Sequence, residues 1–146
     1  MPNNIIRIGA EYAAEIASLN EQCFSEPDSE STVKSLMKDP MMTFFAVIEE
    51  GRALAYCSFA IVAGEIQIVN VATSPEHRGK GYAKMLVKAA LECAASAGCA
   101  QGFLEVRESN AAAIKAYSAA GFAVAGRRRA FYRLPTEDAL VMSVSL

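Results

Sequence analysis

The sequence predicts a single α/β domain in which a mixed, mostly antiparallel sheet is flanked by helices. Its 146 residues match the commonest size of one domain with one core. Apolar residues make up 53% of the chain and charged residues 21%, which excludes a disordered chain and a charge-rich coiled coil. Strand and helix periodicities alternate in the order β-α-α-β-β-β-α-β-α-β-β.

The N-terminal third is predicted to hold one strand and two helices. Residues 5–8 form a short apolar strand, and apolar side chains recur at helical spacing over residues 12–23. Either Ser29 or Ser31 can cap a second short helix, because its side-chain oxygen can accept from a free backbone N–H. Pro40 ends that helix, since the residue before a proline avoids helical dihedral angles.

The middle of the chain is predicted to form four strands and one long helix. Three strands joined by short turns, and therefore antiparallel, are expected at residues 43–49, 53–62 and 65–72. A helix with a clear apolar face follows at residues 83–98, and a strand at residues 102–107. The third strand, this helix and the fourth strand should form a parallel, right-handed crossover.

The chain is expected to end with one helix and two strands. Asn110 caps the helix, which runs to Ala120, and Gly121 takes the left-handed conformation that often follows a helix. Residues 122–126 and 139–145 are the strands. The arginines at 127–129 are expected in a solvated hairpin loop, because no basic helix or interleaved aromatic surface accompanies them as in a nucleic-acid site.

Charge is unevenly distributed along the chain. Residues 1–76 carry 4 basic and 11 acidic side chains, whereas residues 77–146 carry 10 basic and 5 acidic ones. The net charge of −2 argues against binding nucleic acid through bulk charge.

No apolar run reaches the ~18 residues of a membrane span, and the first residues lack the apolar segment of a signal peptide, so we expect no membrane partner.

The cysteines and the single histidine exclude several kinds of site. Cys23, Cys57, Cys93 and Cys99 are spaced as neither zinc nor redox motifs are. With His77 alone, a His–Cys metal site, a Ser-His-Asp triad and a Cys-His enzyme are all disfavoured, and we expect no metal. Unpaired thiols in apolar segments indicate a reducing compartment, which predicts a cytoplasmic protein.

The segment R-G-K-G-Y-A at 78–83 lies between a strand and the long helix. Its glycines permit a tight turn and close backbone approach, and the helix N-terminus offers unpaired N–H groups with a partial positive charge. Arg78, Lys80 and Lys84 add full charges. These features predict a phosphate-binding loop, although its spacing matches neither the Walker nor the dinucleotide motif. The alternative is a plain strand-to-helix connection.

Two parts of the sequence carry a family resemblance. Arg78, Gly81 and Ala83 fill the motif [Q/R]-x-x-G-x-[G/A], which resembles the acetyl-CoA motif of the GNAT superfamily of acyl-CoA N-acyltransferases. The segment 104–122 resembles ribosomal-protein-alanine N-acetyltransferases, as does Arg128-Arg129 with Tyr132 before E-D-A-L-V-M at 137–142. The resemblance implies a GNAT-type fold with the element order above and one N-acetyltransferase domain over residues 1–146.

The resemblance also implies acetyl-CoA as co-substrate. Its pantetheine would pair with the exposed backbone of Val71, Ala72 and Thr73. Asn110 would hydrogen-bond the arm of the co-substrate in addition to, or instead of, capping its helix, in which case Ser109 could supply the cap. The pyrophosphate would lie on the backbone N–H groups of Arg78, Gly79, Lys80, Gly81, Tyr82, Ala83 and Lys84.

The resemblance makes Glu105 the general base and Tyr117 the acid that protonates the CoA thiolate. An α-ammonium, with a pKa of ~7.7–8.0, must lose a proton before the amine can attack, and a carboxylate can take it. A backbone N–H near Val71 would hold the thioester oxyanion. Without the resemblance, Glu105 would be a solvent-facing strand residue paired with Arg107 or another neighbour, and Tyr117 a core aromatic.

The acceptor implied by the resemblance is the N-terminal α-amine of a ribosomal protein. Glu26, Asp28 and Glu30, between the first two helices, and Tyr132, in the last hairpin, would contact it. At residues 26–29 the chain reads E-P-D-S where such enzymes usually carry Pro-Trp-Ser. The alternatives are a small-molecule amine as acceptor, or a non-catalytic acyl-CoA-binding regulator, against which Glu105 and Tyr117 argue. We expect a monomer or a weak dimer.

Overall fold

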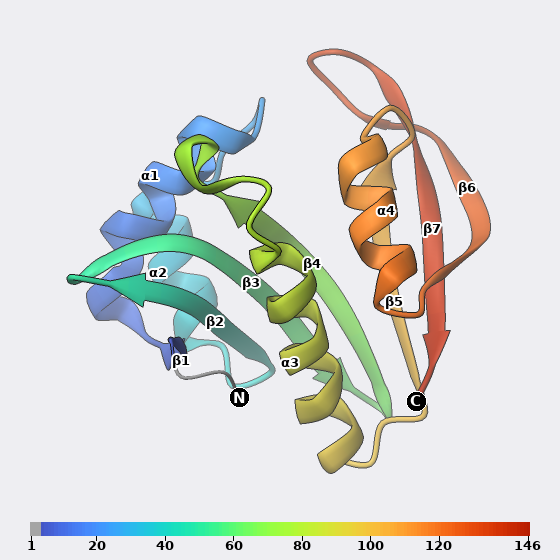
Figure 1. Cartoon of the computed structure of the whole chain (residues 1–146), viewed down its shortest axis with the longest axis horizontal. Helices are drawn as coiled ribbons and strands as arrows, with labels where there is room; N and C mark the ends of the chain where they lie inside the picture. The colour runs from blue at the N-terminus through green and yellow to red at the C-terminus, as the bar shows by residue number, and fades with distance from the viewer. Residues whose placement is uncertain (1–3) are drawn as a thin grey trace.

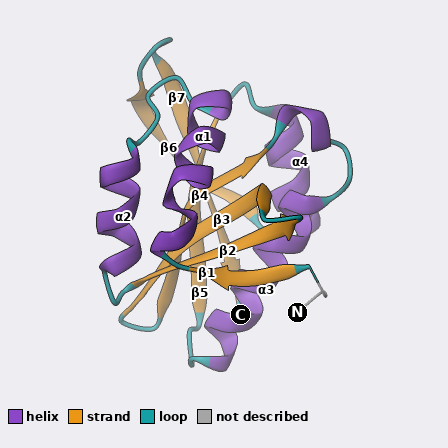
Figure 2. Cartoon of the chain, turned by 90° about the vertical axis from the view of Figure 1, so that its left-hand side faces the viewer, coloured by secondary structure: helices purple, strands orange, loops and turns teal. Residues whose placement is uncertain are grey.

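The computed structural model describes residues 4–146 and shows one seven-stranded sheet between two layers of helices (Figure 1). Helices α1 (Ala13–Cys23) and α2 (Glu30–Lys38) cover one face, and α3 (Tyr82–Ser96) and α4 (Ala111–Ala119) cover the other (Figure 2). Within residues 4–146 no helix is long and apolar enough to cross a membrane.

The sheet order is β1-β2-β3-β4-β5-β7-β6, and every neighbouring pair is antiparallel except β4 with β5. This confirms the predicted fold class and element order. The strands are β1 (Ile5–Ile8), β2 (Met42–Glu49), β3 (Arg52–Val62), β4 (Glu65–Thr73), β5 (Gln101–Arg107), β6 (Ala123–Tyr132) and β7 (Glu137–Ser145).

The expectation that the arginines at 127–129 occupy a hairpin loop is wrong, because β6 continues to Tyr132. The Ala130 N–H donates to Oδ1 of Asp138 at 2.8 Å, which supports an irregular stretch of β6 and keeps it beside β7. Arg127 pairs with Glu108 at 2.7 Å and with Asp138 at 3.2 Å. The charge of Arg127, the first arginine of this run, is therefore paired within the chain.

For α2 and α4, the structure shows which of the two candidate residues is the N-cap. Ser29, not Ser31, caps α2, since its Oγ accepts from the Thr32 N–H at 3.2 Å. Asn110 itself caps α4, with its Oδ1 accepting from the Ala113 N–H at 3.1 Å, so Ser109 does not replace it.

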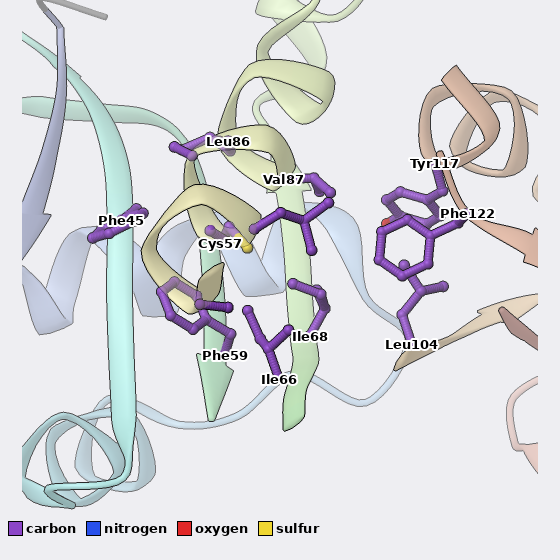
Figure 3. Packing of buried hydrophobic residues seen from close by; sticks show 14 of the residues in the cluster. Phe45, Cys57, Phe59, Ile66, Ile68, Leu86, Val87, Leu104, Tyr117 and Phe122 are labelled. Carbon is purple, nitrogen blue, oxygen red and sulfur yellow. The ribbon is translucent and has the colours of Figure 1, made fainter. Parts of the chain in front are cut away.

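Alternate side chains of the central strands fill two cores. On the side of α1 and α2, Phe44 stacks on Tyr56 with ring centroids 6.0 Å apart. On the side of α3, its neighbour Phe45 meets Phe59 edge-on at 5.1 Å (Figure 3). Successive residues of a strand point to opposite faces, so one strand stabilises both helical layers.

Strands β4 and β5 are joined along only three residue pairs, Glu65–Gln101, Ile66–Gly102 and Gln67–Phe103. Beyond them the two strands diverge (Figure 1). Strand β4 also carries a bulge, because Ser58 of β3 pairs with Asn70 and Phe59 with Ile68, which leaves Val69 as the extra residue. A bulge bends its strand and often lies next to a functional site.

Gly102 lies in the short β4–β5 ladder, where a larger residue does not fit. A Cβ at this position would lie 3.0 Å from Ile66 Cγ2, 3.2 Å from Val144 Cγ1 and 3.4 Å from Leu91 Cδ2. These atoms belong to two strands and to α3, so the close packing at Gly102 joins the two parts of the sheet under that helix.

We expect Gly102→Val to lower the free energy of unfolding by about 1–3 kcal/mol, the usual effect of overpacking a core. The measurement is urea unfolding followed by circular dichroism. Gly126→Val is the matched control, since Gly126 also lies in a strand but its Cβ would meet nothing within 4 Å. Equal stabilities of the two variants would contradict this account of the ladder.

Candidate active site

A cleft of about 1010 Å³ opens where β4 and β5 separate. Residues 67–71 of β4 form one wall and residues 104–107 of β5 form the other. Asn110 and Tyr117 close the cleft from α4. Its far end is closed by the α1–α2 loop at residues 24–28 and by residues 130–135, the end of β6 and the loop that follows it. The cleft thus collects segments from both ends of the chain.

Beyond Gln67, the edge of β4 that faces away from β3 pairs with no other strand. The Thr73 carbonyl accepts from Cys23 Sγ and from Arg78 Nε, both at 3.3 Å, so it faces away from β3. Backbone groups alternate in direction along a strand, which places those of Val71 on the same side and those of Ala72 toward β3. An extended ligand could therefore pair, as an added strand, with the backbone of Val71 and with the Thr73 N–H.

After β4, a 3-10 turn at Pro75–His77 precedes the glycine loop, which leads into α3. Gly79 and Gly81 both have φ of +81°, and Gly81 is the N-cap residue, where no side chain accepts from the first-turn N–H groups. A Cβ at either glycine would meet nothing within 4 Å, so the loop has an open side. The exposed Lys80 and Lys84 flank it. This combination suits a diphosphate.

Glu105 points from β5 into the cleft. Its Oε2 accepts from Gln67 Nε2 at 2.9 Å, and its Oε1 lies 3.5 Å from Arg128 Nε. The expected alternative partner, Arg107, binds Glu137 instead, at 3.1 Å. The Glu105 side chain is 20% exposed, so it is shielded but still open to a ligand.

Tyr117 is both a packed aromatic and part of the cleft wall. Its ring meets Phe122 edge-on at 6.4 Å (Figure 3). Its hydroxyl has no hydrogen-bond partner within residues 4–146, yet it is not fully enclosed by the chain. Burial raises the pKa of Tyr117, so the phenol stays protonated at any physiological pH.

Asn110 lines the cleft while it caps α4. Only its side-chain oxygen is used by the cap, and the amide nitrogen donates to no group in the described chain. Asn110 can therefore cap α4 through its side-chain oxygen and donate to a ligand through its nitrogen, which are the two functions that the sequence suggested.

The acceptor residues suggested by the sequence do not all lie together. Asp28, Tyr132 and Glu26 line the cleft, but Arg133 binds Glu26 through two hydrogen bonds of 3.0 and 2.8 Å and lowers its pKa. Burial raises the pKa of Tyr132 to about 12. Glu30 stands outside the cleft, as the first residue of α2, and pairs with Lys34 at 3.2 Å.

Sequence reasoning missed several residues of the cleft. Gln67 could have been noticed as a polar residue in an otherwise Ile- and Val-rich strand, and Arg107 because it shares a strand face with Glu105. Cys23, one of the four cysteines that fit no zinc or redox motif, lies in the cleft beside Thr73 and 3.6 Å from Arg78 Nη2. No local sequence signal indicates that position.

Comparisons with known proteins identify the family of the chain. Residues 13–122 match the model of the acetyltransferase (GNAT) family. The [ribosomal protein bS18]-alanine N-acetyltransferase of Escherichia coli K12 is 30% identical over 132 residues, which are 88% of this chain and 87% of that protein. The streptothricin acetyltransferase of Streptomyces lavendulae is 36% identical over 107 residues, 70% of this chain and 57% of that protein.

A solved structure is similar over nearly the whole chain. The crystal structure of the ribosomal-protein-S18-alanine N-acetyltransferase from Escherichia coli superposes with a TM-score of 0.88 and 27% sequence identity. The similarity covers 97% of this chain and 92% of that one.

We expect Gly81→Glu to weaken acetyl-CoA binding at least tenfold, or about 1.4 kcal/mol, because it places a negative charge and a strained residue where the pyrophosphate would bind. Titration calorimetry measures the affinity. Gly64→Glu is the control, since Gly64 has a φ of +79° and equally open surroundings, but lies in the β3–β4 turn. Unchanged affinity in a folded Gly81→Glu variant would place the co-substrate elsewhere.

Proposed function

The chain belongs to the GNAT family of acetyltransferases and is an acyl-CoA-dependent N-acetyltransferase, and we propose that its acceptor is the N-terminal α-amine of a protein, specifically a ribosomal protein. The observation that carries the proposal is the cleft between β4 and β5. It combines a free strand edge, the Glu105 carboxylate and the Tyr117 phenol in one space, near a glycine loop whose geometry suits an anion.

Acetyl-CoA, the co-substrate of the family, would lie along the β4 side of the cleft. The pantetheine would pair with the backbone of Val71 and Thr73, and the Asn110 amide would donate to it. The pyrophosphate would bind the N–H groups at residues 78–84. The thioester would then lie along β4, within the walls that also hold Glu105 and Tyr117.

Glu105 would accept the proton of the acceptor ammonium, with Gln67 fixing the orientation of the carboxylate. The amine nitrogen then bonds to the thioester carbon. As the carbon–sulfur bond breaks, the nitrogen gives up its remaining extra proton to the departing sulfur, so CoA leaves as the thiol. A backbone N–H near Val71 would stabilise the oxyanion. Tyr117 would donate to the departing sulfur. Because a thiol is a stronger acid than this buried phenol, we expect a hydrogen bond to the thiolate rather than full proton transfer.

Two relatives bear on the identity of the acceptor. The Escherichia coli enzymes named for ribosomal protein S18 support a protein N-terminus, and they match almost the full length of the chain. The streptothricin acetyltransferase supports a small amine as the second candidate. Its match covers a smaller share of both proteins, so the protein acceptor is the better supported of the two.

Mass spectrometry of acetylation reactions separates the candidates. The wild-type enzyme should acetylate the terminal amine of peptides that copy ribosomal protein N-termini faster than polyamines, amino acids or amino sugars. Faster reaction with the small amines would support the second candidate. Binding of acetyl-CoA without turnover of any amine would instead support a regulator.

Replacing Glu105 with Gln keeps the shape of the side chain but removes the proton acceptor. We expect kcat/KM for the best amine to fall by ~10²–10⁴ at pH 7, with the loss shrinking as the pH approaches the pKa of the amine. Steady-state rates across pH measure this. Glu108→Gln is the control, because Glu108 is bound to Arg127 and does not line the cleft. Wild-type rates for Glu105→Gln would assign the base to another group.

Asp28 is the carboxylate of the α1–α2 loop that lines the cleft without an ion pair in the described chain. Asp28→Asn should raise KM for a basic peptide about 1.5- to 5-fold, as losing an exposed pair of ~0.2–1 kcal/mol would. It should also weaken the salt dependence of kcat/KM between ~50 and 300 mM, where exposed charges become screened. Glu30→Gln, outside the cleft, should change neither quantity. Equal effects of the two substitutions would refute this role of Asp28.

A further inference from the structure

Arg107, the last residue of β5, binds three segments at once. Its Nη1 donates to the Pro135 carbonyl at 2.9 Å and to Glu137 Oε1 at 3.1 Å. Its Nη2 donates to the Arg133 carbonyl at 2.8 Å and to Ser25 Oγ at 3.2 Å. The strand is thereby connected to the β6–β7 loop, to β7 and to the α1–α2 loop.

The β6–β7 loop contains a residue in an unfavourable backbone conformation. Leu134 has a φ of +55°, and the left-handed region costs a non-glycine residue about 1–2 kcal/mol. The carbonyls on both sides of Leu134, those of Arg133 and Pro135, accept from Arg107. Such conformations persist only where the surroundings hold them, and here the guanidinium supplies two of the contacts that do so.

The same guanidinium supports Tyr132 and the opposite loop. It lies 4.6 Å from the centroid of the Tyr132 ring, a cation–π arrangement. Ser25 also donates to the Arg133 carbonyl at 3.2 Å, and Glu26 binds the Arg133 side chain. The Arg133 side chain is 75% exposed and that of Arg107 only 24%. The Arg107 contacts should therefore stabilise the two loops more than the ion pair between Arg133 and Glu26 does.

We propose that Arg107 is a positioning residue for the acceptor: it sets the separation of the α1–α2 and β6–β7 loops, and so the shape of the acceptor end of the cleft. The inference rests on the proposed function, which places the acceptor between these loops. Lysine cannot replace Arg107, because the four contacts need the planar, forked donors of a guanidinium. Arg107 makes no hydrogen bond to β4 or to residues 78–84 within the described chain.

The first test is kinetic. Arg107→Met and Arg107→Lys should each raise KM for the peptide acceptor at least tenfold, with kcat within about threefold of wild type and acetyl-CoA affinity unchanged. Arg127→Met is the matched control, since Arg127 has two ion pairs, with Glu108 just after β5 and with Asp138 of β7, but does not line the cleft. It should leave all three quantities at wild-type values.

The second test needs no acceptor. Hydrogen exchange at residues 24–28 and 133–136 should become faster in both Arg107 variants and not in Arg127→Met. If wild type acetylates no peptide, the proposed function fails, while the exchange rates still decide whether Arg107 holds the loops. The inference would be overturned if Arg107→Met kept both the wild-type KM for the peptide and the wild-type exchange rates of the loops. The same result for Arg107→Lys would also overturn it. Should Arg107→Met fail to fold, Arg107→Lys carries both tests.

Discussion

The divergence of two parallel strands is the constraint on which the rest of this molecule depends. Strands β4 and β5 share three residue pairs and then separate, each held on its other side by an antiparallel partner. Backbone N–H and C=O groups need hydrogen-bond partners. The two strand edges that face each other past Gln67 must therefore meet solvent or a ligand, and the cleft is the space between them.

The cleft brings together groups of different chemistry. Its β4 side continues into a loop whose glycines and helix N-terminus favour a diphosphate, whereas its β5 side presents Glu105. The acidic and basic halves of the sequence meet at the acceptor end of the cleft. Glu26 from the first half binds Arg133 from the second, so the fold interleaves the opposite charges at the acceptor end and leaves Asp28 to act on a ligand.

Local features of the fold were predictable from sequence, and non-local ones were not. The caps at Ser29 and Asn110, and the glycine loop, each depend on a few neighbouring residues, so local rules find them. The bond between Glu26 and Arg133 joins residues 107 apart in the chain, and the register that extends β6 past Arg129 depends on Asp138. Such contacts follow from strand pairing, which periodicity does not specify. The placement of Cys23 in the cleft, and of Glu30 outside it, has the same origin.

The central claim is that acetyl-CoA binds as an added strand on the free edge of β4. Amide hydrogen exchange resolved by NMR, with and without acetyl-CoA, tests it most directly. The account predicts that the co-substrate slows exchange at Val71 and Thr73 and at residues 78–84, while Ala72, whose N–H faces β3, changes little. Protection confined to residues 104–107 of β5, or binding with no protection on β4, would contradict it.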